Sequence, residues 1–341
     1  MKQPFTQLAH SIVNQSFSST WNMSKITKKN ARRLSLINHN PSLQLNDALF
    51  EKFKIHMRSY RNCVPFSMKF EEMNNIKSIE HKLHCPSQAK ISHSHNCLCI
   101  SDNLDSELKF FDLITHEYLG GFLVEGVTGL LIEENFDDQQ NDAIYFGKNK
   151  YTFKYRVKDL MRLGSSADCI WKIERNHMYG MAIRTIGNQK QLFRYSASQG
   201  VMDIIDTVNG KVIKELKLEK LDRVMDIIFI NPKRMLVAEL FHNACFIYDE
   251  MNENEWKLIQ TIEKAENIYF SQPLGLAIDR TGGKIFLSDY DIKRIVVFNE
   301  SLDLIDCHYP ESLNPFRLDF DETTGLLYIT DQQDDSIRIF K

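Results

Sequence analysis

The sequence predicts an all-β fold: a six-bladed β-propeller of four-stranded antiparallel blades, preceded by a short N-terminal helix and a disordered arm. Three observations predict it. A unit of three short strands is clearest at Ser271–Phe298, a related unit recurs every 42 to 50 residues, and the last unit stops without a fourth strand. Repeats of this length with about four strands each are typical of propeller blades.

The clearest unit alternates apolar and small residues over Leu274–Asp279 and then reverses at Gly282-Gly283. A second extended run, Ile285–Leu287, leads to Asp289, whose carboxylate can accept bonds from nearby backbone N–H groups and so start a turn. Arg294–Phe298 supplies the third strand. Three short strands cannot bury both of their faces alone, so the unit requires neighbours of the same kind.

Six positions mark the end of a second strand in successive units. They are Asp102, Gly147, Tyr195, Glu239, Asp289 and Asp331. Matching first strands are expected from Ser87, Thr128, Tyr179, Met225, Leu274 and Phe316. Six marks predict six blades.

The last unit ends at Lys341, directly after its third strand. Upstream of the first unit, Met68–Leu83 contains the run NIKSIEHKL, which is expected to form a lone outer strand. We expect this segment to complete the last blade and close the ring, because closure leaves no long strand edge exposed.

The net charge of −3 is unevenly distributed along the 341 residues. Residues 1–65 hold ten Lys or Arg against Asp47 and Glu51, a net charge of +8, which leaves −11 on the remainder. Residues 1–45 are therefore expected to be a basic disordered arm. An acid-free, Ser-rich, basic start is also typical of a mitochondrial presequence, and a third interpretation is an arm that docks on anionic surfaces.

Leu49, Phe53, Met57 and Tyr60 recur at helical spacing, and Asn46 is placed to cap. An amphipathic helix is thus expected over Asp47–Tyr60, within a helix-and-linker segment at 46–65 that leads into the propeller at 66–341. Packing against the main domain is favoured over a membrane or partner helix.

Seven cysteines at irregular spacing, without a secretory signal, indicate reduced thiols. No apolar run reaches the roughly eighteen residues needed to span a bilayer. The expected location is cytoplasmic, with a mitochondrial location as the alternative.

The repeats resemble the NHL repeat in their Pro, Gly, strand ending in Asp, Gly-rich turn, Ser/Thr-Asp, and Arg-Ile-x-Val/Ile-Phe pattern. The pattern is best matched at Pro273–Asn299, then at Pro315–Phe340 and Pro86–Asp112, whereas Thr128–Asp249 lacks the Asp and the Arg-Ile pair. The resemblance implies a six-bladed propeller that binds proteins or RNA, often attached to ubiquitin-ligase domains. The sequence contains no zinc-ligand framework for such a ligase domain.

Acidic residues follow the second strand in most units. They are Asp102, Asp105 and Glu107, then Glu239, then Asp289 and Asp291, and finally Asp331, Asp334 and Asp335. Each Asp can cap its own turn, which is the simpler interpretation for Asp102, Asp289 and Asp331. Together, on one face of a propeller, they would attract a basic protein segment and repel phosphate, which weighs against nucleic-acid binding.

Seven possible metal ligands lie between His81 and Cys99. His93, His95 and Cys97 are the residues that a zinc site would use, but Cys-x-Cys and His-x-His depart from the usual Cys-x2-Cys spacing. Cys99 corresponds to Phe286 and Tyr328 of later units, which predicts burial in the core.

Some six-bladed propellers are calcium-dependent lactonases or esterases, which is the alternative function. Such a metal needs several oxygen ligands from different inner strands. The comparable channel-mouth positions hold Gln88, Gly129, Gly180, Asp226, Gly275 and Arg317. One carboxylate beside an arginine makes a poor calcium site. We therefore predict a non-enzymatic protein-binding scaffold without a cofactor.

Overall fold

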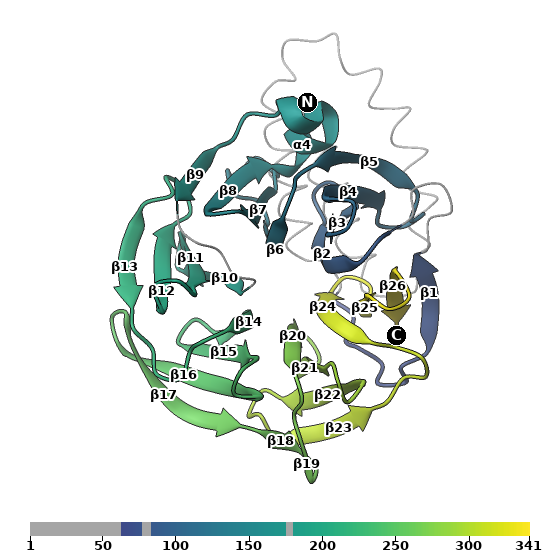
Figure 1. Cartoon of the computed structure of the whole chain (residues 1–341), viewed down its shortest axis with the longest axis vertical. Helices are drawn as coiled ribbons and strands as arrows, with labels where there is room; N and C mark the ends of the chain where they lie inside the picture. The colour runs from purple at the N-terminus through teal and green to yellow at the C-terminus, as the bar shows by residue number, and fades with distance from the viewer. Residues whose placement is uncertain (1–62, 77–82, 175–179) are drawn as a thin grey trace, which may run out of the picture. The chain divides into compact units, whose positions relative to one another are not determined.

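The computed structural model describes residues 63–76, 83–174 and 180–341, which belong to one compact unit, Asn62–Lys341. The described residues form six four-stranded antiparallel sheets arranged around a central axis (Figure 1). The predicted fold class is confirmed. The predicted arm at 1–45 and the predicted helix at Asp47–Tyr60 lie outside the described residues.

Each of the first three blades is a continuous run of chain. Blade 1 contains β2 (Pro86–Ser92), β3 (Cys97–Asp102), β4 (Glu107–Asp112) and β5 (Tyr118–Leu123). Blade 2 contains β6 (Val127–Glu133), β7 (Ala143–Lys148), β8 (Tyr151–Arg156) and β9 (Trp171–Glu174). Blade 3 contains β10 (Met181–Ile186), β11 (Gln189–Ser196), β12 (Val201–Asp206) and β13 (Val212–Leu216).

The next blades repeat this order. Blade 4 contains β14 (Val224–Asn231), β15 (Arg234–Glu239), β16 (Ala244–Asn252) and β17 (Glu255–Ile262). Blade 5 contains β20 (Pro273–Asp279), β21 (Lys284–Asp289), β22 (Arg294–Asn299) and β23 (Leu304–His308). Blade 6 contains β24 (Pro315–Asp321), β25 (Leu326–Asp331) and β26 (Ser336–Phe340), with β1 (Glu72–Ile76) as its fourth strand.

The closing strand lies in the expected segment. β1 runs antiparallel to β26, with Asn75 opposite Arg338 and Ile76 opposite Ile337. Ile76 is buried against blades 6 and 1, which explains why the ring closes at this position. The strand begins at Glu72, earlier than the NIKSIEHKL run indicates, and residues 77–82 of that run lie outside the described residues.

The second strands carry the core between blades. β3 is buried along its whole length, whereas outer β5 alternates between partly buried and exposed residues. This difference follows from position, because a second strand has a sheet neighbour on both sides and a blade against each face. Phe286 of blade 5 stacks on Phe320 of blade 6 with ring centroids 5.9 Å apart.

Two elements are absent from the sequence prediction. A helix, α4 (Val157–Leu163), and a 3-10 turn, η2 (Gly164–Ser166), stand between β8 and β9 and bury Val157 and Leu160. A hairpin, β18 (Lys264–Ala265) and β19 (Ile268–Tyr269), connects blades 4 and 5. No helix in the described ranges is both long and apolar enough to cross a membrane.

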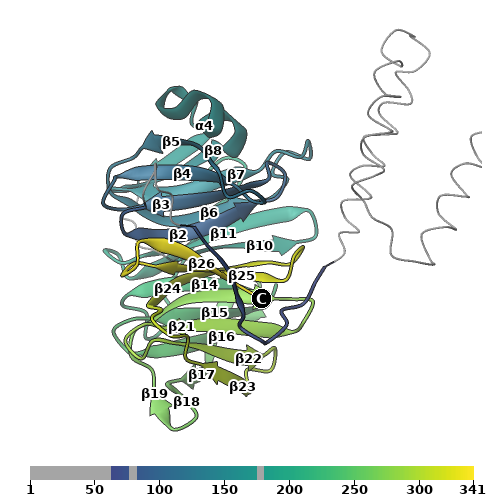
Figure 2. The ribbon, with the colours of Figure 1, turned by 90° about the vertical axis from the view of Figure 1, so that its right-hand side faces the viewer.

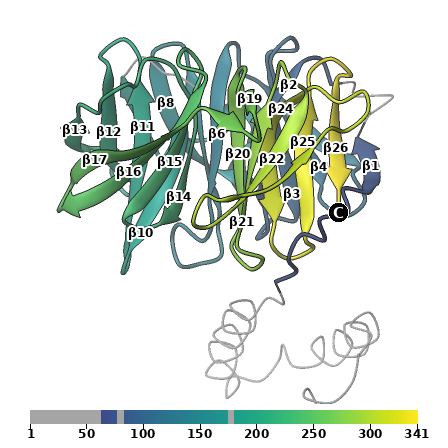
Figure 3. The same cartoon turned by 90° about the horizontal axis from the view of Figure 1, so that it is seen from below.

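The antiparallel order gives the ring two distinct faces. The turns between first and second strands and between third and fourth strands lie at one end, which we call the inner-turn face. The turns between second and third strands, and the connections between blades, lie at the opposite end, the middle-turn face. Figures 1 and 2 show the hairpin β18–β19 projecting outward from the rim of the ring, and Figure 3 views the ring from its edge, with the strands running between the two faces.

The chain enters the ring on the inner-turn face, at residues 63–70. Val64 N–H donates to Glu322 O at 2.7 Å, and Phe66 N–H donates to the Asp279 carboxylate at 2.9 Å. Phe66 packs edge to face on Phe286 at 5.1 Å. This short segment therefore wedges between blades 5 and 6 before β1 closes the ring.

Candidate functional site

Four of the predicted acidic residues, Asp102, Glu239, Asp289 and Asp331, are fully buried. Each accepts a backbone N–H from the loop that enters the first strand of its own blade. The donors are His84 at 2.8 Å, Arg223 at 2.5 Å, Ser271 at 2.7 Å and Asn314 at 3.4 Å, in the same order. These carboxylates hold the loop that leads into the first strand of each of the four blades, and they are buried away from solvent.

Cations of the third strands compensate two of these buried carboxylates. Lys109 Nζ lies 2.9 Å from Asp102, and Arg294 Nε lies 2.8 Å from Asp289. Burial raises the pKa of Asp289, against the opposing effect of the Ser271 N–H and Arg294. The same cause raises the pKa of Asp102, against Lys109 and the His84 N–H. Removing a cation would leave a buried, uncompensated carboxylate.

Own-turn capping, the simpler sequence interpretation, holds for Asp331, which accepts the N–H groups of Gln333 and Asp334 at 3.1 and 3.2 Å. For Asp102 and Asp289 the acceptor role is directed instead to the loop before the first strand. The bond to the entry loop is common to all four carboxylates, because that loop ends beside the second strand and its N–H groups face the carboxylate.

The residue before the Asp has a matching role. The first strand of blade 5 is irregular between Pro273 and Leu276, and Gly275 N–H donates to Ser288 Oγ at 2.7 Å. Blade 6 repeats this bond, because Arg317 N–H donates to Thr330 Oγ1 at 2.8 Å. The Ser/Thr-Asp pair therefore satisfies backbone groups that the irregular first strand leaves outside the sheet.

The remaining predicted acids lie at the turn tips of three neighbouring blades. Asp291 of blade 5 and Asp334 and Asp335 of blade 6 are exposed, and Asp105 of blade 1 is partly exposed. Asp335 accepts the Cys85 N–H at 2.7 Å, which connects blade 6 to blade 1. We call Asp105, Asp291, Asp334 and Asp335 the acidic arc.

The predicted channel-mouth residues are buried and interlocked. Gln88 Oε1 accepts the Leu130 N–H of blade 2 at 2.7 Å. Arg317 of blade 6 reaches the carbonyls of Leu274 in blade 5 and Met225 in blade 4, and its NH1 lies 4.0 Å from Asp226. The arginine thus bridges inner strands at this level instead of leaving room for oxygen ligands.

A second pair of charges lies deeper among the inner strands. Lys90 Nζ of blade 1 donates to the Asp319 carboxylate of blade 6 at 2.8 Å. Burial opposes its charge, but Asp319 and Asp226 outweigh that effect and raise the pKa of Lys90. With Asp226 and Arg317, the central channel contains two cations and two carboxylates in mutual compensation.

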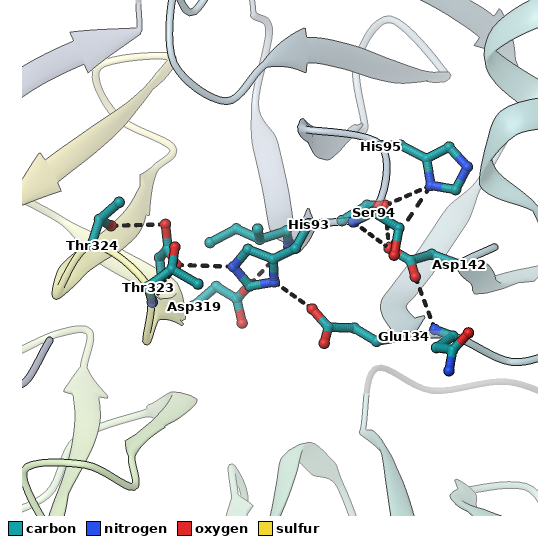
Figure 4. Close-up of polar contacts among 12 residues, drawn as sticks. His93, Ser94, His95, Glu134, Asp142, Asp319, Thr323 and Thr324 are labelled. Atoms are coloured by element: carbon teal, nitrogen blue, oxygen red, sulfur yellow. Dashed lines mark hydrogen bonds and ion pairs between the residues drawn. The ribbon is translucent and has the colours of Figure 1, made fainter. Parts of the chain in front are cut away.

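A charged cluster joins three blades on the inner-turn face (Figure 4). His93 contacts the Glu134 carboxylate of blade 2 through Nδ1 and the Asp321 carboxylate of blade 6 through Nε2, the latter at 2.9 Å. Burial opposes protonation, but the two carboxylates raise the pKa of His93 to about 9. The imidazolium is therefore charged at neutral pH and bridges blades 1, 2 and 6.

Asp142 of blade 2 is the buried anchor beside this bridge. It accepts bonds from Ser92 Oγ at 2.6 Å, Ser94 N–H at 3.2 Å and Asn135 N–H at 2.9 Å. His95 Nδ1 lies 3.8 Å from it. Burial opposes the charge, yet these donors lower the pKa of Asp142.

The three residues considered for zinc point to different surroundings. His93 faces Glu134 and Asp321, His95 faces Asp142, and Cys97 is buried in the apolar core. Among the described residues, no group of three or more His, Cys, Asp or Glu side chains converges as a metal site. Cys99 is buried, as its alignment with Phe286 and Tyr328 predicts.

Several functional side chains escape sequence reasoning. Lys90 and Lys109 lie on strands as isolated cations, and Glu134 lies in a longer turn without a repeat equivalent. One signal was available for Lys109 and Arg294: both stand in the third strand shortly after the acidic end of a second strand.

No family model matches the sequence, and no curated protein matches it. Among solved structures, the chain is similar to the β-propeller domain of Cps50 (Swd1) from Myceliophteria thermophila, with a TM-score of 0.57 and 12% identity over 80% of this chain and 99% of that one. It is also similar to the WD40 β-propeller domain of Doa1, with a TM-score of 0.52 and 11% identity over 74% of this chain and 77% of that one. At these identities the likeness establishes the propeller fold alone.

Proposed function

We propose that the ring is a non-enzymatic, NHL-like interaction scaffold that binds a basic segment of a protein partner through the acidic arc. One observation carries the proposal. Asp291, Asp334 and Asp335 are exposed on adjoining turns, whereas the carboxylates that shape the blades are buried. The residues after Arg61 carry a net charge of −11, so the surrounding field also favours a cationic partner.

The hydrogen bonds across the central channel support a non-enzymatic role. Calcium-dependent hydrolysis would need several oxygen ligands at the channel mouth. That position holds the Arg317 guanidinium, which bonds to backbone carbonyls of two other blades. A propeller used for binding requires only a rigid ring with exposed turns.

The experiment measures fluorescence anisotropy of labelled octa-arginine with the full-length protein. The arc variant combines Asp291→Asn, Asp334→Asn and Asp335→Asn, since asparagine keeps an acceptor for the Cys85 N–H. The control variant combines Glu117→Gln, Glu253→Gln and Glu300→Gln, three exposed acids in turns of the inner-turn face. Both change the net charge equally.

We expect the arc variant to bind about tenfold more weakly at low salt, because three exposed charge pairs each contribute up to about 0.5 kcal/mol. The control should stay within about twofold of the parent protein, and added salt should weaken the parent's binding. Equal affinities of the two variants would contradict the proposal.

A further inference from the structure

The turns between second and third strands have the same form in blades 4, 5 and 1. In each, one backbone N–H donates to the carbonyl three residues earlier, and the donor residue has a positive φ of 49°, 58° or 54°. The bonded pairs are Asn243 with Leu240 at 3.2 Å, Lys293 with Tyr290 at 3.0 Å, and Ser106 with Asn103 at 3.3 Å. Because the flanking strands pair in the same register, the second residue of each turn occupies an equivalent place.

This equivalent place carries an acid in blade 5 and apolar residues in blades 4 and 1. The acid is Asp291 of the acidic arc, and the apolar residues are Phe241 in blade 4 and Leu104 in blade 1. Phe241 is 64% exposed and Leu104 is 76% exposed, whereas most large apolar residues of the ring are buried. We call Phe241 and Leu104 the apolar tips. They border the acidic arc, one at each end.

The Phe241 turn is held beside Asp291 by the connection between blades 4 and 5. The Gln272 N–H donates to Asn243 Oδ1 at 3.0 Å, and Gln272 Nε2 donates to Asp291 Oδ2 at 2.9 Å. The Arg223 guanidinium lies 5.5 Å from the centre of the Phe241 ring, within the range of a cation–π contact. The exposed ring is therefore supported from the protein side and stands next to the first carboxylate of the arc.

The Leu104 turn is held at the other end of the arc. The Leu104 N–H donates to His84 O at 3.2 Å, and Asp105 of the arc follows Leu104 in the chain. The next residue after His84 is Cys85, whose N–H donates to the Asp335 carboxylate of blade 6 at 2.7 Å. The turn tips of blades 6 and 1 are thus joined, as those of blades 4 and 5 are.

The other half of the middle-turn face differs in charge. The turn of blade 2 carries Lys150 next to Lys148, with Glu174 beside Lys150, and the turn of blade 3 carries Ser198. Neither turn contains an acidic residue. A basic segment therefore gains charge contacts along blades 5, 6 and 1 and not along blades 2 and 3.

A segment of moderate length can reach both apolar tips. Blades 1 and 4 are three places apart in a ring of six, so they lie on opposite sides of the axis (Figure 1). A ring of this size has a radius of gyration of about 19 Å, which places opposite tips within about 40 Å of each other. An extended segment of about twelve residues spans about 40 Å.

We propose that the partner's basic segment carries apolar residues on both sides of its Lys or Arg residues. The apolar residues pack on Phe241 and Leu104, and the basic residues lie over the acidic arc between them. This inference rests on the proposed function, because it names the kind of segment that the same surface selects. It adds a requirement that charge alone does not impose: a purely basic segment binds more weakly.

Fluorescence anisotropy with two labelled peptides tests the inference on the full-length protein. One peptide has about six arginines with Leu-Ser-Leu at each end, and the other has serine in place of every leucine, so their charges are equal. We expect the leucine peptide to bind about tenfold more tightly, because it buries apolar surface at both ends. Equal affinities would overturn the inference, while binding of the serine peptide that weakens in the arc variant would still support the proposed function. If neither peptide binds, both proposals fail.

Two double variants locate the apolar contribution. The tip variant, Phe241→Ser with Leu104→Ser, should reduce the advantage of the leucine peptide to within about twofold. The control variant, Tyr269→Ser with Ile114→Ser, should keep the full advantage. Its residues match the apolar tips in exposure, at 63% and 76%, but Tyr269 lies on the hairpin at the rim and Ile114 in a turn of the inner-turn face. An advantage that survives in the tip variant, or that falls equally in both variants, would overturn the inference.

Discussion

The two faces of the ring use charge in different ways. On the middle-turn face, the buried carboxylates bond within their own blade, as Asp289 does with Ser271 and Arg294. On the inner-turn face, several charged side chains bond to a neighbouring blade. His93 contacts Glu134 and Asp321. The others are Lys190 to Glu134 O, Arg184 to Pro232 O and Glu250, and Arg280 to Phe229 O and Ile230 O. Charged contacts between blades therefore gather on the inner-turn face, although Asp335 also joins blade 6 to blade 1 on the middle-turn face through the Cys85 N–H.

The largest expected effect comes from a buried carboxylate. Asp289→Ala should lower the free energy of unfolding by about 3 to 5 kcal/mol, because it leaves the fully buried Arg294 without its carboxylate partner. Urea unfolding of the full-length protein measures the loss. Asp291→Ala, in the same turn but exposed, is the control and should cost less than about 0.5 kcal/mol. Equal losses in the free energy of unfolding would contradict the distinction between the buried carboxylates and the exposed carboxylates at the turn tips.

The bridge between blades should make stability depend on pH. The pKa of His93 is raised from 6.5 to about 9 in the folded protein, so its stabilisation is fully present below about pH 6.5 and is lost as pH rises through about 9. The side chain is only 16% exposed, and the shift corresponds to up to about 3 kcal/mol. Unfolding midpoints measured between pH 6 and 10 follow this loss.

His93→Gln is the control for that profile. Glutamine can still hydrogen-bond to Glu134 or Asp321 but carries no charge, so the variant should be less stable at pH 6 and show a flatter decline to pH 10. Burial opposes ionisation of Asp321, but His93, Thr323 and Thr324 lower its pKa, so its own stabilisation is lost only in acid, below the window tested. If the stability of the variant declined with pH as steeply as that of the parent protein, His93 would not be the group that titrates.

A smaller effect is expected where the channel arginine passes Gly275. A Cβ on this residue would lie 2.7 Å from Arg317 Cα and 2.9 Å from Leu318 N, both backbone atoms. Gly275→Ala should therefore destabilise the protein by about 1 to 3 kcal/mol. Gly121→Ala meets only the movable side-chain ends of Glu107 and Tyr118 and serves as the control. Thermal unfolding of both variants would separate backbone crowding from loss of a glycine as such.

The sequence predicted much of the architecture because each blade repeats a local pattern. Pro, Gly and Ser/Thr-Asp recur at fixed places, and their bonds are formed within one blade, as with Ser288 and Asp289. The contacts that assemble the ring are different. Glu134 and Asp321 lie 41 and 228 residues after His93 in the sequence, and the three share no repeated motif, so only the closed ring brings them together.

The prediction of site residues was limited in the same way, to what a local pattern can show. The acidic positions were found, but the sequence could not tell a buried Asp102 from an exposed Asp335, because both lie at or shortly after the end of a second strand, in equivalent parts of blades 1 and 6. The hairpin β18–β19 also gave no signal, because its paired strands are two residues each and fall between blades.

Urea unfolding of two triple variants tests most directly whether the charged contacts that stabilise the ring lie on the inner-turn face. The arc variant, with Asp291, Asp334 and Asp335 changed to Asn, should unfold within about 0.5 kcal/mol of the parent protein. A link variant with His93→Gln, Lys190→Gln and Arg280→Gln should lose at least about 2 kcal/mol, because it removes charged contacts across four blade junctions. A loss in the arc variant as large as that in the link variant would contradict the account.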